Sequence, residues 1–296
     1  MMTTLITKAD HINELQFKQL RQLAQECEAF DHSLPYMYWE IIARQRIIPC
    51  NLFCYVDDKL VAYMTFFHFE KGCLHILAIV HPEFRKQGVF KNMLREAMTE
   101  MRVLNPKRTT FSFPVTQKAA ANLVRSIGAV FSHVEYRMDR QYTGEEALDD
   151  HRLTFARATG DDVTHVAKLD ELVFQGDYPA MVERFKITMQ EKNREVWLAY
   201  LNGECIGKAH LLFDEEEVCI HDIAITPLEQ RKGYGLALLK WMVNYLIKTH
   251  PKKIYLEVEA LNKSALKLYE RCHFDMTREY ECWKSPFEQV QNFLQK

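Results

Sequence analysis

Hydrophobic and polar positions follow two different periods in the second half of the chain. Residues 152–157 alternate between apolar and polar side chains, which predicts a strand. The apolar residues from Val163 to Val173 recur at helical spacing, which predicts a helix. A loop at 175–179 is expected next, followed by a second short helix that ends near Lys192.

A β-hairpin is the clearest local feature of this half. Asn202-Gly203, a dipeptide typical of a two-residue hairpin turn, separates apolar segments at 196–201 and 205–213. The three glutamates at 215–217 are expected to form the next turn. The remaining predicted elements are a strand at 218–226, a helix at 236–248, a strand at 254–260, a helix at 264–272 and a strand from Phe274.

The first half shows the same order of elements after a longer first helix at 12–30. Each half therefore has a strand, two helices, a three-strand meander, and then alternating helices and strands. This order predicts an α+β fold in which each half forms a mixed, mostly antiparallel sheet flanked by helices.

The two halves also match residue by residue when one is shifted by 145 positions. Gly88 falls on Gly233 (233 − 88 = 145), and no gap is needed between about residues 52 and 129. A period of this size indicates a duplicated domain rather than a solenoid unit. We expect an N-terminal domain at 1–140 and a C-terminal domain at 151–296.

The segment Gln230–Gly235 reads Q-x-x-G-x-G between a predicted strand and a predicted helix. Glycines let backbone N–H groups turn inward, and the N-terminus of the following helix favours an anion. Arg231 and Lys232 add positive charge, so the loop suits a pyrophosphate. A tight helix entry that needs the glycines only for packing is the alternative. No G-K-[ST] follows, and a meander precedes the loop, so it is neither a P-loop nor a dinucleotide fingerprint.

Two segments of this half resemble motifs of the GNAT acetyltransferase superfamily. Residues 221–227 and 230–235 are similar to motif A, and residues 256–262 and 268–270 to motif B. The resemblance implies that the two motif strands splay apart and that the pantetheine arm of acetyl-CoA, the co-substrate, lies between them. The residues that it assigns to cofactor binding are Ile223, Ala224, Ile225, Gln230, Arg231, Lys232, Gly233, Tyr234, Gly235, Leu236, Asn262 and Ala265.

Transfer of acetyl to an amine poses two proton problems. An alkyl amine is mostly protonated at neutral pH, and a thiolate leaves more readily when it is protonated. The resemblance implies that Tyr269 is the general acid at the CoA sulfur. Glu257 corresponds to the base of ribosomal-protein alanine N-acetyltransferases, and His221 lies near a catalytic histidine of arylalkylamine N-acetyltransferases. Glu217 and Glu259 are weaker choices of base.

One position departs from the family pattern. The family usually has glycine before the phenylalanine of motif B, whereas this chain has His273-Phe274. The substitution puts the local turn in question. A role for His273 in lining the mouth of the cofactor site is the alternative interpretation.

The first half keeps the anion-binding loop but loses the catalytic candidates. The residues at the positions of Tyr269, Glu257 and His221 are Val124, Ser112 and Ile76. The first domain is therefore expected to bind CoA or to serve as a structural module. This pattern resembles tandem GNAT enzymes such as mycothiol synthase, in which only one domain catalyses. The cofactor-binding residues expected in this half are Val80, Arg85, Lys86, Gln87, Gly88, Val89 and Phe90.

Composition narrows the classes of partner. The formal net charge of −2 gives no basic field for nucleic acid. The 8 cysteines form no C-x-x-C pair, and no H-E-x-x-H occurs, so no metal is expected. The first residues contain no apolar signal segment and no apolar run is long enough to span a bilayer, which predicts a cytoplasmic protein without a membrane partner. Delivery into a host cell stays open.

The leading functional class is therefore an N-acetyltransferase that acts on a primary amine of a protein, a peptide or a small molecule. The second class is a non-catalytic acyl-CoA sensor or interaction module. The pairing of Tyr269 with Glu257 favours the enzyme, because a module that only binds needs neither group.

Overall fold

The computed structural model describes residues 4–33, 35–70, 72–148, 152–174, 177–250 and 252–295. The chain divides into two compact units, here called unit 1 (Met1–Glu135 with Arg278–Lys296) and unit 2 (Tyr136–Thr277). Gln175 and Gly176 of the predicted loop lie outside the described residues. In the part of the chain that is described, no helix is long and apolar enough to cross a membrane.

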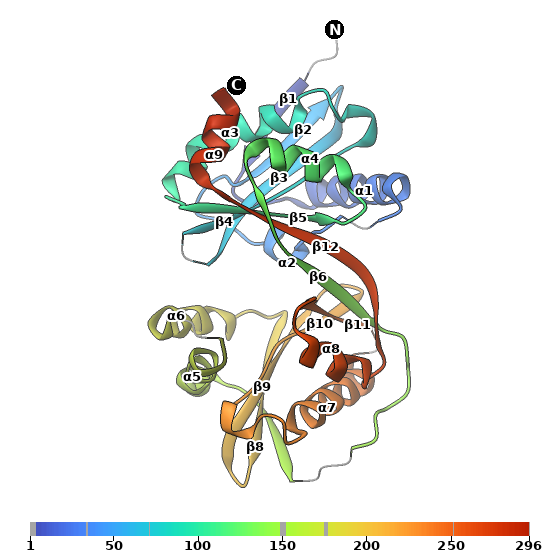
Figure 1. Cartoon of the computed structure of the whole chain (residues 1–296), viewed down its shortest axis with the longest axis vertical. Coiled ribbons are helices and arrows are strands. Elements are labelled where there is room, and N and C mark those ends of the chain that lie inside the picture. Colours follow the sequence, from blue (N-terminus) through green and yellow to red (C-terminus); the bar gives the residue numbers. More distant parts are fainter. Residues whose placement is uncertain are drawn as a thin grey trace. The chain divides into compact units, whose positions relative to one another are not determined.

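The sheet of unit 1 has the strand order β1-β2-β3-β4-β5-β12 (Figure 1). Neighbouring strands are antiparallel, except that β4 and β5 are parallel. The strands of the first copy are β1 Thr4–Ala9, β2 Asn51–Val56, β3 Lys59–Glu70, β4 Cys73–Val80, β5 Arg108–Pro114 and β6 Val130–Arg140.

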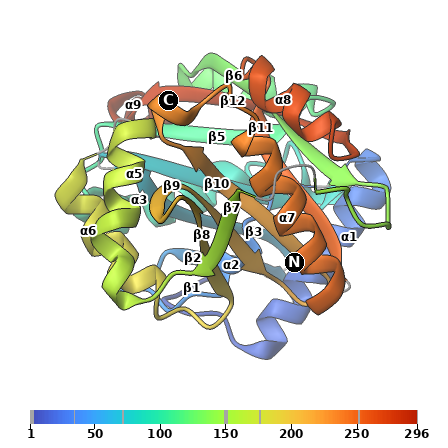
Figure 2. The ribbon, with the colours of Figure 1, turned by 90° about the horizontal axis from the view of Figure 1, so that it is seen from below.

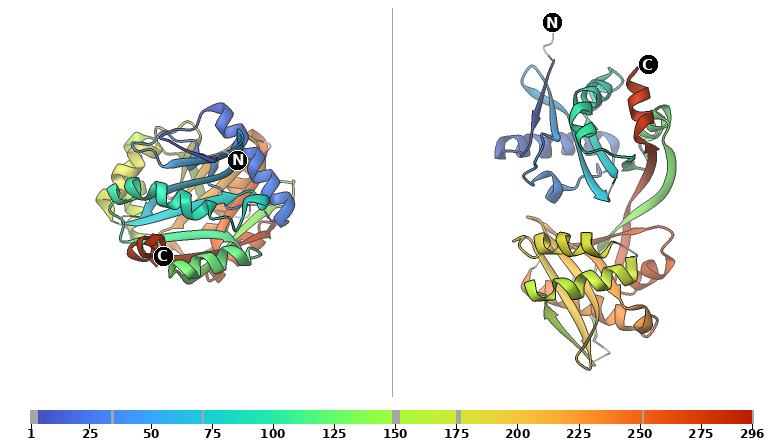
Figure 3. Two further views of the ribbon diagram at one scale, coloured as in Figure 1. Left: turned by 90° about the horizontal axis from the view of Figure 1, so that it is seen from above. Right: turned by 90° about the vertical axis from the view of Figure 1, so that its left-hand side faces the viewer.

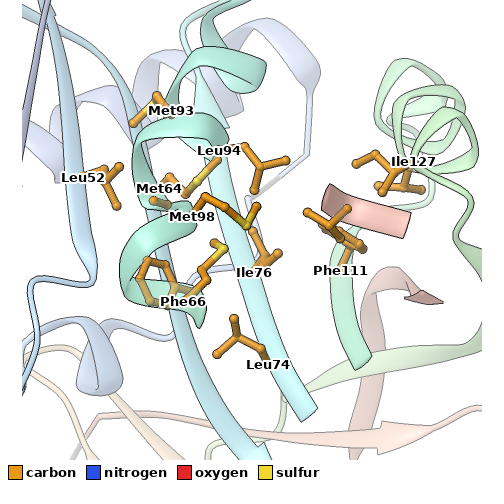
Figure 4. Packing of buried hydrophobic residues seen from close by; sticks show 14 of the residues in the cluster. Leu52, Met64, Phe66, Leu74, Ile76, Met93, Leu94, Met98, Phe111 and Ile127 are labelled. Atoms are coloured by element: carbon orange, nitrogen blue, oxygen red, sulfur yellow. The ribbon is translucent and has the colours of Figure 1, made fainter. Parts of the chain in front are cut away.

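Helices cover both faces of this sheet. They are α1 Glu14–Asp31, α2 Trp39–Ile42, α3 Val89–Val103, α4 Lys118–Ile127 and α9 Phe287–Gln295. On one face, α1 buries Leu20 and Leu23 against Tyr63 of β3. On the other face, α3, α4 and α9 enclose the larger core, in which Figure 4 shows Met98 beside Ile76. Burial of each such aliphatic side chain contributes roughly 1.5–3 kcal/mol.

The sheet of unit 2 has the strand order β6-β11-β10-β9-β8-β7. The meander of β8, β9 and β10 is antiparallel, whereas β10 and β11 are parallel. The strands of the second copy are β7 Leu153–Arg157, β8 Arg194–Leu201, β9 Glu204–Phe213, β10 Glu217–Ile225, β11 Lys253–Glu259 and β12 Phe274–Pro286. Both units thus have the predicted α+β class, with a mixed and mostly antiparallel sheet.

Unit 2 also has helices on both faces, as Figures 2 and 3 show. They are α5 Val163–Phe174, α6 Tyr178–Thr188, α7 Tyr234–Thr249 and α8 Lys263–Glu270. Beneath α5 and α6, Val166 and Phe185 pack on Leu198 of β8. Beneath α7 and α8, Leu239 and Met242 pack on Ile220 of β10.

The two copies exchange their last strands. β6 ends the first copy, but its hydrogen-bonded neighbour in unit 2 is β11. β12 ends the second copy, but from Tyr280 to Pro286 it pairs antiparallel with β5 of the first copy. The compact units therefore differ from the linear ranges 1–140 and 151–296, because residues 278–296 pack with the first copy.

Most predicted elements are present, and the hairpin has the expected turn. Asn202 and Gly203 both have positive φ, 52° and 85°, as a type I′ turn requires. The prediction of a loop at 175–179 is wrong for its last two residues, because α6 begins at Tyr178. The Asp177 side chain caps this helix by accepting from the Ala180 N–H, and proline suits a first turn.

Two other expectations are corrected. The second helix ends at Thr188 rather than near Lys192. Glu217 belongs to β10 rather than to a turn. Its carboxylate accepts a 2.7 Å hydrogen bond from Arg137. An added helix, α9, follows β12 and buries Val290 in the unit 1 core.

His273, which precedes the phenylalanine of motif B, has the left-handed backbone conformation that favours glycine. His273 has φ of 62°, and Gly128, at the same position of the first copy, has φ of 93°. A left-handed residue other than glycine costs roughly 1–2 kcal/mol. His273 packs on the Tyr142 ring at 4.8 Å and lies 3.9 Å from Glu146, so neighbouring groups hold it in this conformation.

Candidate active site

The strands of the two motifs in unit 2 diverge as the family resemblance implies. β10 and β11 pair only at residues 217–219 and 253–255. β10 nevertheless continues to Ile225 and β11 to Glu259. Beyond Cys219, backbone N–H and C=O groups on this side of β10 have no β11 partner, and such groups need partners when they are buried. Ile223, Ala224 and Ile225 lie on this stretch.

A β-bulge interrupts β10 at the point of divergence. His221 pairs with His210 and Ala224 with Lys208, so two residues of β10 oppose one of β9. Asp222, the first of these two, has φ of 49°. Bulges redirect side chains next to active sites. The pairing of β4 with β3 in unit 1 runs without an irregularity past Leu77, the counterpart of Asp222.

The bulge gathers charged and polar side chains around the Asp222 carboxylate. His221 Nδ1 lies 3.4 Å and Arg184 Nη2 3.4 Å from its Oδ2 atom. His210 Nδ1 lies 3.9 Å from the same atom. Burial opposes ionisation of this carboxyl, but His221, His210 and the nearby Lys208 hold its pKa well below the ordinary value. Asp222 is therefore an anion at neutral pH.

The anion-binding loop has the backbone geometry that the sequence predicts. Arg231 and Gly233 are both left-handed, with φ of 64° and 91°, and Gly233 is the N-cap of α7. The Gln230 side chain donates to Ile225 O at 2.9 Å, which ties the loop to the end of β10. A Cβ at Gly233 would meet nothing within 4 Å, so space for a ligand adjoins the backbone. The loop thus presents an exposed backbone turn at the N-terminus of α7, a position that favours an anion.

Other residues of this loop have packing contacts instead. Tyr234 is buried, and Arg152 lies 5.2 Å from the centre of its ring. A Cβ at Gly235 would lie 3.2 Å from a Leu268 methyl, so this glycine allows α7 to approach α8. Lys232 forms an exposed ion pair with Glu229 at 3.0 Å. Leu236 and Ala265 pack on the core beneath α7 and α8.

Tyr269 lies on α8 near the divergence of the strands. Burial raises the pKa of its hydroxyl to about 12, and the nearby Cys219 and Asp222 add to the shift. Cys219 is the last β10 residue that pairs with β11, and Asp222 forms the bulge. The Tyr269 phenol is therefore protonated at neutral pH.

The three remaining predicted residues have different surroundings. Glu257 is exposed on β11. His221 Nε2 lies 3.3 Å from Arg194 Nη1, and its Nδ1 faces Asp222, so both ring nitrogens have neighbours. Asn262 is the N-cap of α8, where its Oδ1 accepts from Ala265 N at 3.1 Å.

Sequence reasoning missed a buried polar network beside the bulge. Lys208 Nζ lies 2.6 Å from Asp170 Oδ1 and 2.9 Å from His210 Nε2. An ammonium can only donate, so Nε2 accepts and the His210 proton sits on Nδ1, toward Asp222. Alternating polar residues in the apolar strand β9 are the signal that could have identified it. The ligand atoms of His210, His221 and Asp222 lie within 4.8 Å of one another, but adjacent lysine and arginine side chains disfavour a cation there.

Unit 1 contains a cavity of about 480 Å³ in the equivalent place. It begins where β4 and β5 stop pairing, after Ile76 and Phe111, and extends to the first copy of the loop. Lys86 and Gly88 repeat the left-handed pair, with φ of 62° and 81°. The predicted cofactor-binding residues that line the cavity are Val80, Arg85, Lys86, Gly88, Val89 and Phe90.

Two predicted residues of this loop have structural partners. Arg85 Nη1 and Nη2 bind the Asp31 carboxylate at 2.6 and 2.7 Å, and its Nε donates to Val80 O. Its side chain thus secures the loop to β4, as Gln230 does in unit 2. The Gln87 side chain donates to Glu83 O at 2.7 Å.

Comparisons with known proteins agree with this geometry. Streptothricin acetyltransferase A of Bacillus subtilis (strain 168) is 30% identical over 87 residues, 29% of this chain and 50% of that protein. The ribosomal protein bS18-alanine N-acetyltransferase of Escherichia coli (strain K12) is 38% identical over 74 residues, 25% of this chain and 50% of that protein. The chain thus spans about half the length of these curated relatives.

A solved structure shares the fold over nearly the whole chain. The tandem GNAT protein from the clavulanic acid biosynthesis pathway superposes with a TM-score of 0.73 over 96% of this chain and 98% of that chain, at 11% identity. This likeness shows the fold alone. The acetyltransferase (GNAT) family model matches residues 16–128 and 162–274, which together exceed half of the sequence. The chain therefore belongs to the acetyltransferase (GNAT) family, with one family domain in each copy.

Proposed function

We propose that this chain is an acetyl-CoA-dependent N-acetyltransferase that transfers acetyl to a primary amine by direct attack, with catalysis in unit 2. The observation that carries this proposal is the position of Tyr269. Its ring is partly buried against the core of unit 2, and its hydroxyl is protonated and near Cys219, after which β10 and β11 diverge. A proton donor there meets the thiolate that departs when the thioester is cleaved.

Acetyl-CoA supplies the activated acetyl group, and the chain holds it by backbone groups in this proposal. The amides of Arg231, Gly233 and Gly235 receive the pyrophosphate at the N-terminus of α7. The unpaired edge of β10 at Ile223 and Ile225 pairs with the pantetheine arm. Support comes from the left-handed loop and from the open space beside Gly233.

Three proton transfers accompany the reaction. Glu257 accepts a proton from the ammonium form of the acceptor, through water where the distance requires it, and the free amine then attacks the thioester carbon. The C–N bond forms, the C–S bond breaks, and Tyr269 protonates the CoA sulfur. The second proton that the nitrogen loses passes through water to the Tyr269 phenolate and restores the phenol. His221 is the weaker base, because Arg194 occupies its Nε2 side.

The acceptor class is a primary amine of a protein, a peptide or a small molecule. The two relatives are named for different acceptors, streptothricin and an alanine of ribosomal protein bS18. Each covers only part of this chain, so neither name selects the acceptor. Unit 1 in this proposal holds a second molecule of acetyl-CoA in its cavity.

Replacement of Tyr269 by phenylalanine tests the assignment. The variant keeps the ring but loses the proton, so we expect CoA release in the presence of an active amine to fall by roughly 10²–10⁴-fold. Tyr200→Phe is the matched control, since Tyr200 lies on β8 under α5 and α6. An unchanged rate in Tyr269→Phe would remove Tyr269 from the mechanism. Binding of acetyl-CoA without turnover by any amine would favour the sensor.

A further inference from the structure

Polar side chains line the unit 1 cavity, which also contacts Ile76 and Phe111, the last paired residues of β4 and β5. Ser112 follows Phe111 on β5, and the other polar residues of the lining include Tyr36, Asp31, Ser33 and Gln117. The counterpart of Tyr269 in this copy, Val124, is apolar. The polar groups of unit 1 therefore come from different elements.

Tyr36 connects the cavity to a buried carboxylate. Its hydroxyl donates to Glu135 Oε2 at 2.7 Å, and it accepts from the Tyr38 hydroxyl at 2.5 Å. Glu135 lies behind Tyr36, where its Oε1 is 3.4 Å from His133 Nε2. Burial opposes ionisation, but the bonds to His133 and Tyr36 outweigh it and lower the pKa of the Glu135 carboxyl below its ordinary value. An ionised proton acceptor thus lies one hydrogen bond from the cavity.

The exchanged strand β12 completes these surroundings. The Tyr280 ring packs on the Tyr36 ring with 4.4 Å between centroids, which fixes the direction of the Tyr36 hydroxyl. Cys282 Sγ lies 3.3 Å from Ser112 Oγ. Burial, with the charge of Glu135, raises the pKa of the Cys282 thiol to about 12, so this sulfur stays protonated and is a poor nucleophile. The step considered below is therefore a direct transfer that does not use Cys282.

We propose that unit 1 carries a second acyl-transfer site, in which Tyr36 relays a proton from the attacking amine to Glu135. The proposal rests on the proposed function, because it needs acetyl-CoA in the unit 1 cavity. An unprotonated primary amine attacks the thioester carbon, forming the C–N bond and breaking the C–S bond. The amine proton passes to the Tyr36 oxygen while Tyr36 passes its own proton to Glu135. CoA leaves as a thiolate and takes a proton from water.

This site differs chemically from the one in unit 2. Tyr269 donates a proton to the leaving sulfur, whereas Tyr36 passes a proton away from the nucleophile. Glu135 accepts, through Tyr36, only the one proton that the attacking nitrogen releases, and no further group in this proposal removes a proton from an ammonium. The unit 1 site therefore suits an amine that is largely unprotonated at neutral pH, such as an aromatic amine or a hydroxylamine.

The full-length chain tests the proposal with acetyl-CoA as donor and hydroxylamine as acceptor, by chromatography of acetohydroxamate. Tyr269→Phe silences the acid of unit 2. We expect this variant to keep a rate above the uncatalysed reaction, and the added change Tyr36→Phe to lower that remaining rate by roughly 10²-fold or more. Glu135→Gln in the same background should also lower it and should make the fall in rate at acid pH less steep, because only the protonation of hydroxylamine then contributes to that fall. A structural role for Glu135 would leave the steepness of that acid fall unchanged.

Stoichiometry separates the possible failures. We expect calorimetry to give two equivalents of acetyl-CoA for wild type, Tyr269→Phe and the double variant, which also shows that each is folded. A Tyr269→Phe variant that binds two equivalents but does not exceed the uncatalysed rate overturns the unit 1 site and leaves the proposed function intact. An unchanged rate on adding Tyr36→Phe has the same meaning. A wild-type chain without turnover overturns both.

Discussion

The Lys208 ammonium nitrogen lies 2.6 Å from the Asp170 carboxylate oxygen Oδ1, and their side chains are 0% and 3% exposed. This pair joins α5 to β9 directly behind the bulge at Asp222. Two charges in such a place stabilise the fold only as a pair, because each alone would be buried without compensation.

Removal of the lysine should therefore destabilise unit 2. We expect Lys208→Met to lower the free energy of unfolding by about 3–5 kcal/mol, since it leaves the Asp170 carboxylate buried without its partner. The double variant Lys208→Met with Asp170→Leu should recover a large part of the loss. Urea titration followed by circular dichroism measures both. Equal stabilities of the single and double variants would contradict the pairing.

Asp222 makes stability depend on pH in a defined direction. Its pKa in the folded state is depressed well below the ordinary value, so it binds fewer protons there than in the unfolded chain. The stabilisation is therefore complete above the unfolded pKa and is lost as the pH falls through the folded pKa. Unfolding titrations at several pH values should show that the free energy of unfolding of wild type exceeds that of Asp222→Asn by less and less as the solution becomes acidic. A constant difference between them would refute this.

The loop glycine should be needed for cofactor binding beyond its effect on the backbone. Gly233→Ala places a methyl group in the open space beside the loop and strains a residue with φ of 91° by roughly 1–2 kcal/mol. We expect weaker binding of acetyl-CoA in unit 2, measured by calorimetry. Gly203→Ala is the matched control, because φ there is 85° and the space is also open, but the glycine lies in the β8–β9 hairpin. Equal affinities of the two variants would contradict a ligand at Gly233.

The strand exchange predicts the effect of a C-terminal truncation. A chain that ends at Thr277 loses Trp283, Phe287 and Val290, which are buried in the core of unit 1. At roughly 1.5–3 kcal/mol for each such side chain, the loss approaches the 5–15 kcal/mol that stabilises a typical domain. We expect hydrogen exchange to show loss of protection in β2–β5, although the deletion falls in the second copy. Full protection there would refute the exchange.

Much of the fold follows from the order of side chains. The hairpin at Asn202-Gly203 is local, because two residues with positive φ specify the turn without help from the rest of the chain. The loop at Gly233 and its copy at Gly88 were predictable for the same reason. Because the copies align at a constant shift of 145 residues, each prediction for one copy also applied to the equivalent residues of the other.

The side chains around these loops were harder to predict from the sequence. Asp222 and His221 are neighbours in sequence, but the contact of His221 with Arg194 depends on how β8 pairs with β9 and β9 with β10. Tyr36 and Glu135 are 99 positions apart, and no sequence period connects them. The first copy has no proton-transfer group at the positions equivalent to Tyr269, Glu257 and His221, so its sequence did not predict one.

The sequence by itself determined the duplicated α+β fold and the two left-handed loops at Gly88 and Gly233, and it predicts Tyr269 as the acid, because each depends on local periodicity or on a motif. Only the tertiary structure decided which strand completes each sheet. The last strands of similar copies present similar hydrogen-bonding edges, so their pattern does not select a partner. That choice places β12 beside β5, and with it Tyr280 against Tyr36. Side chains brought together over such separations are set by packing of the whole chain, which no single segment encodes.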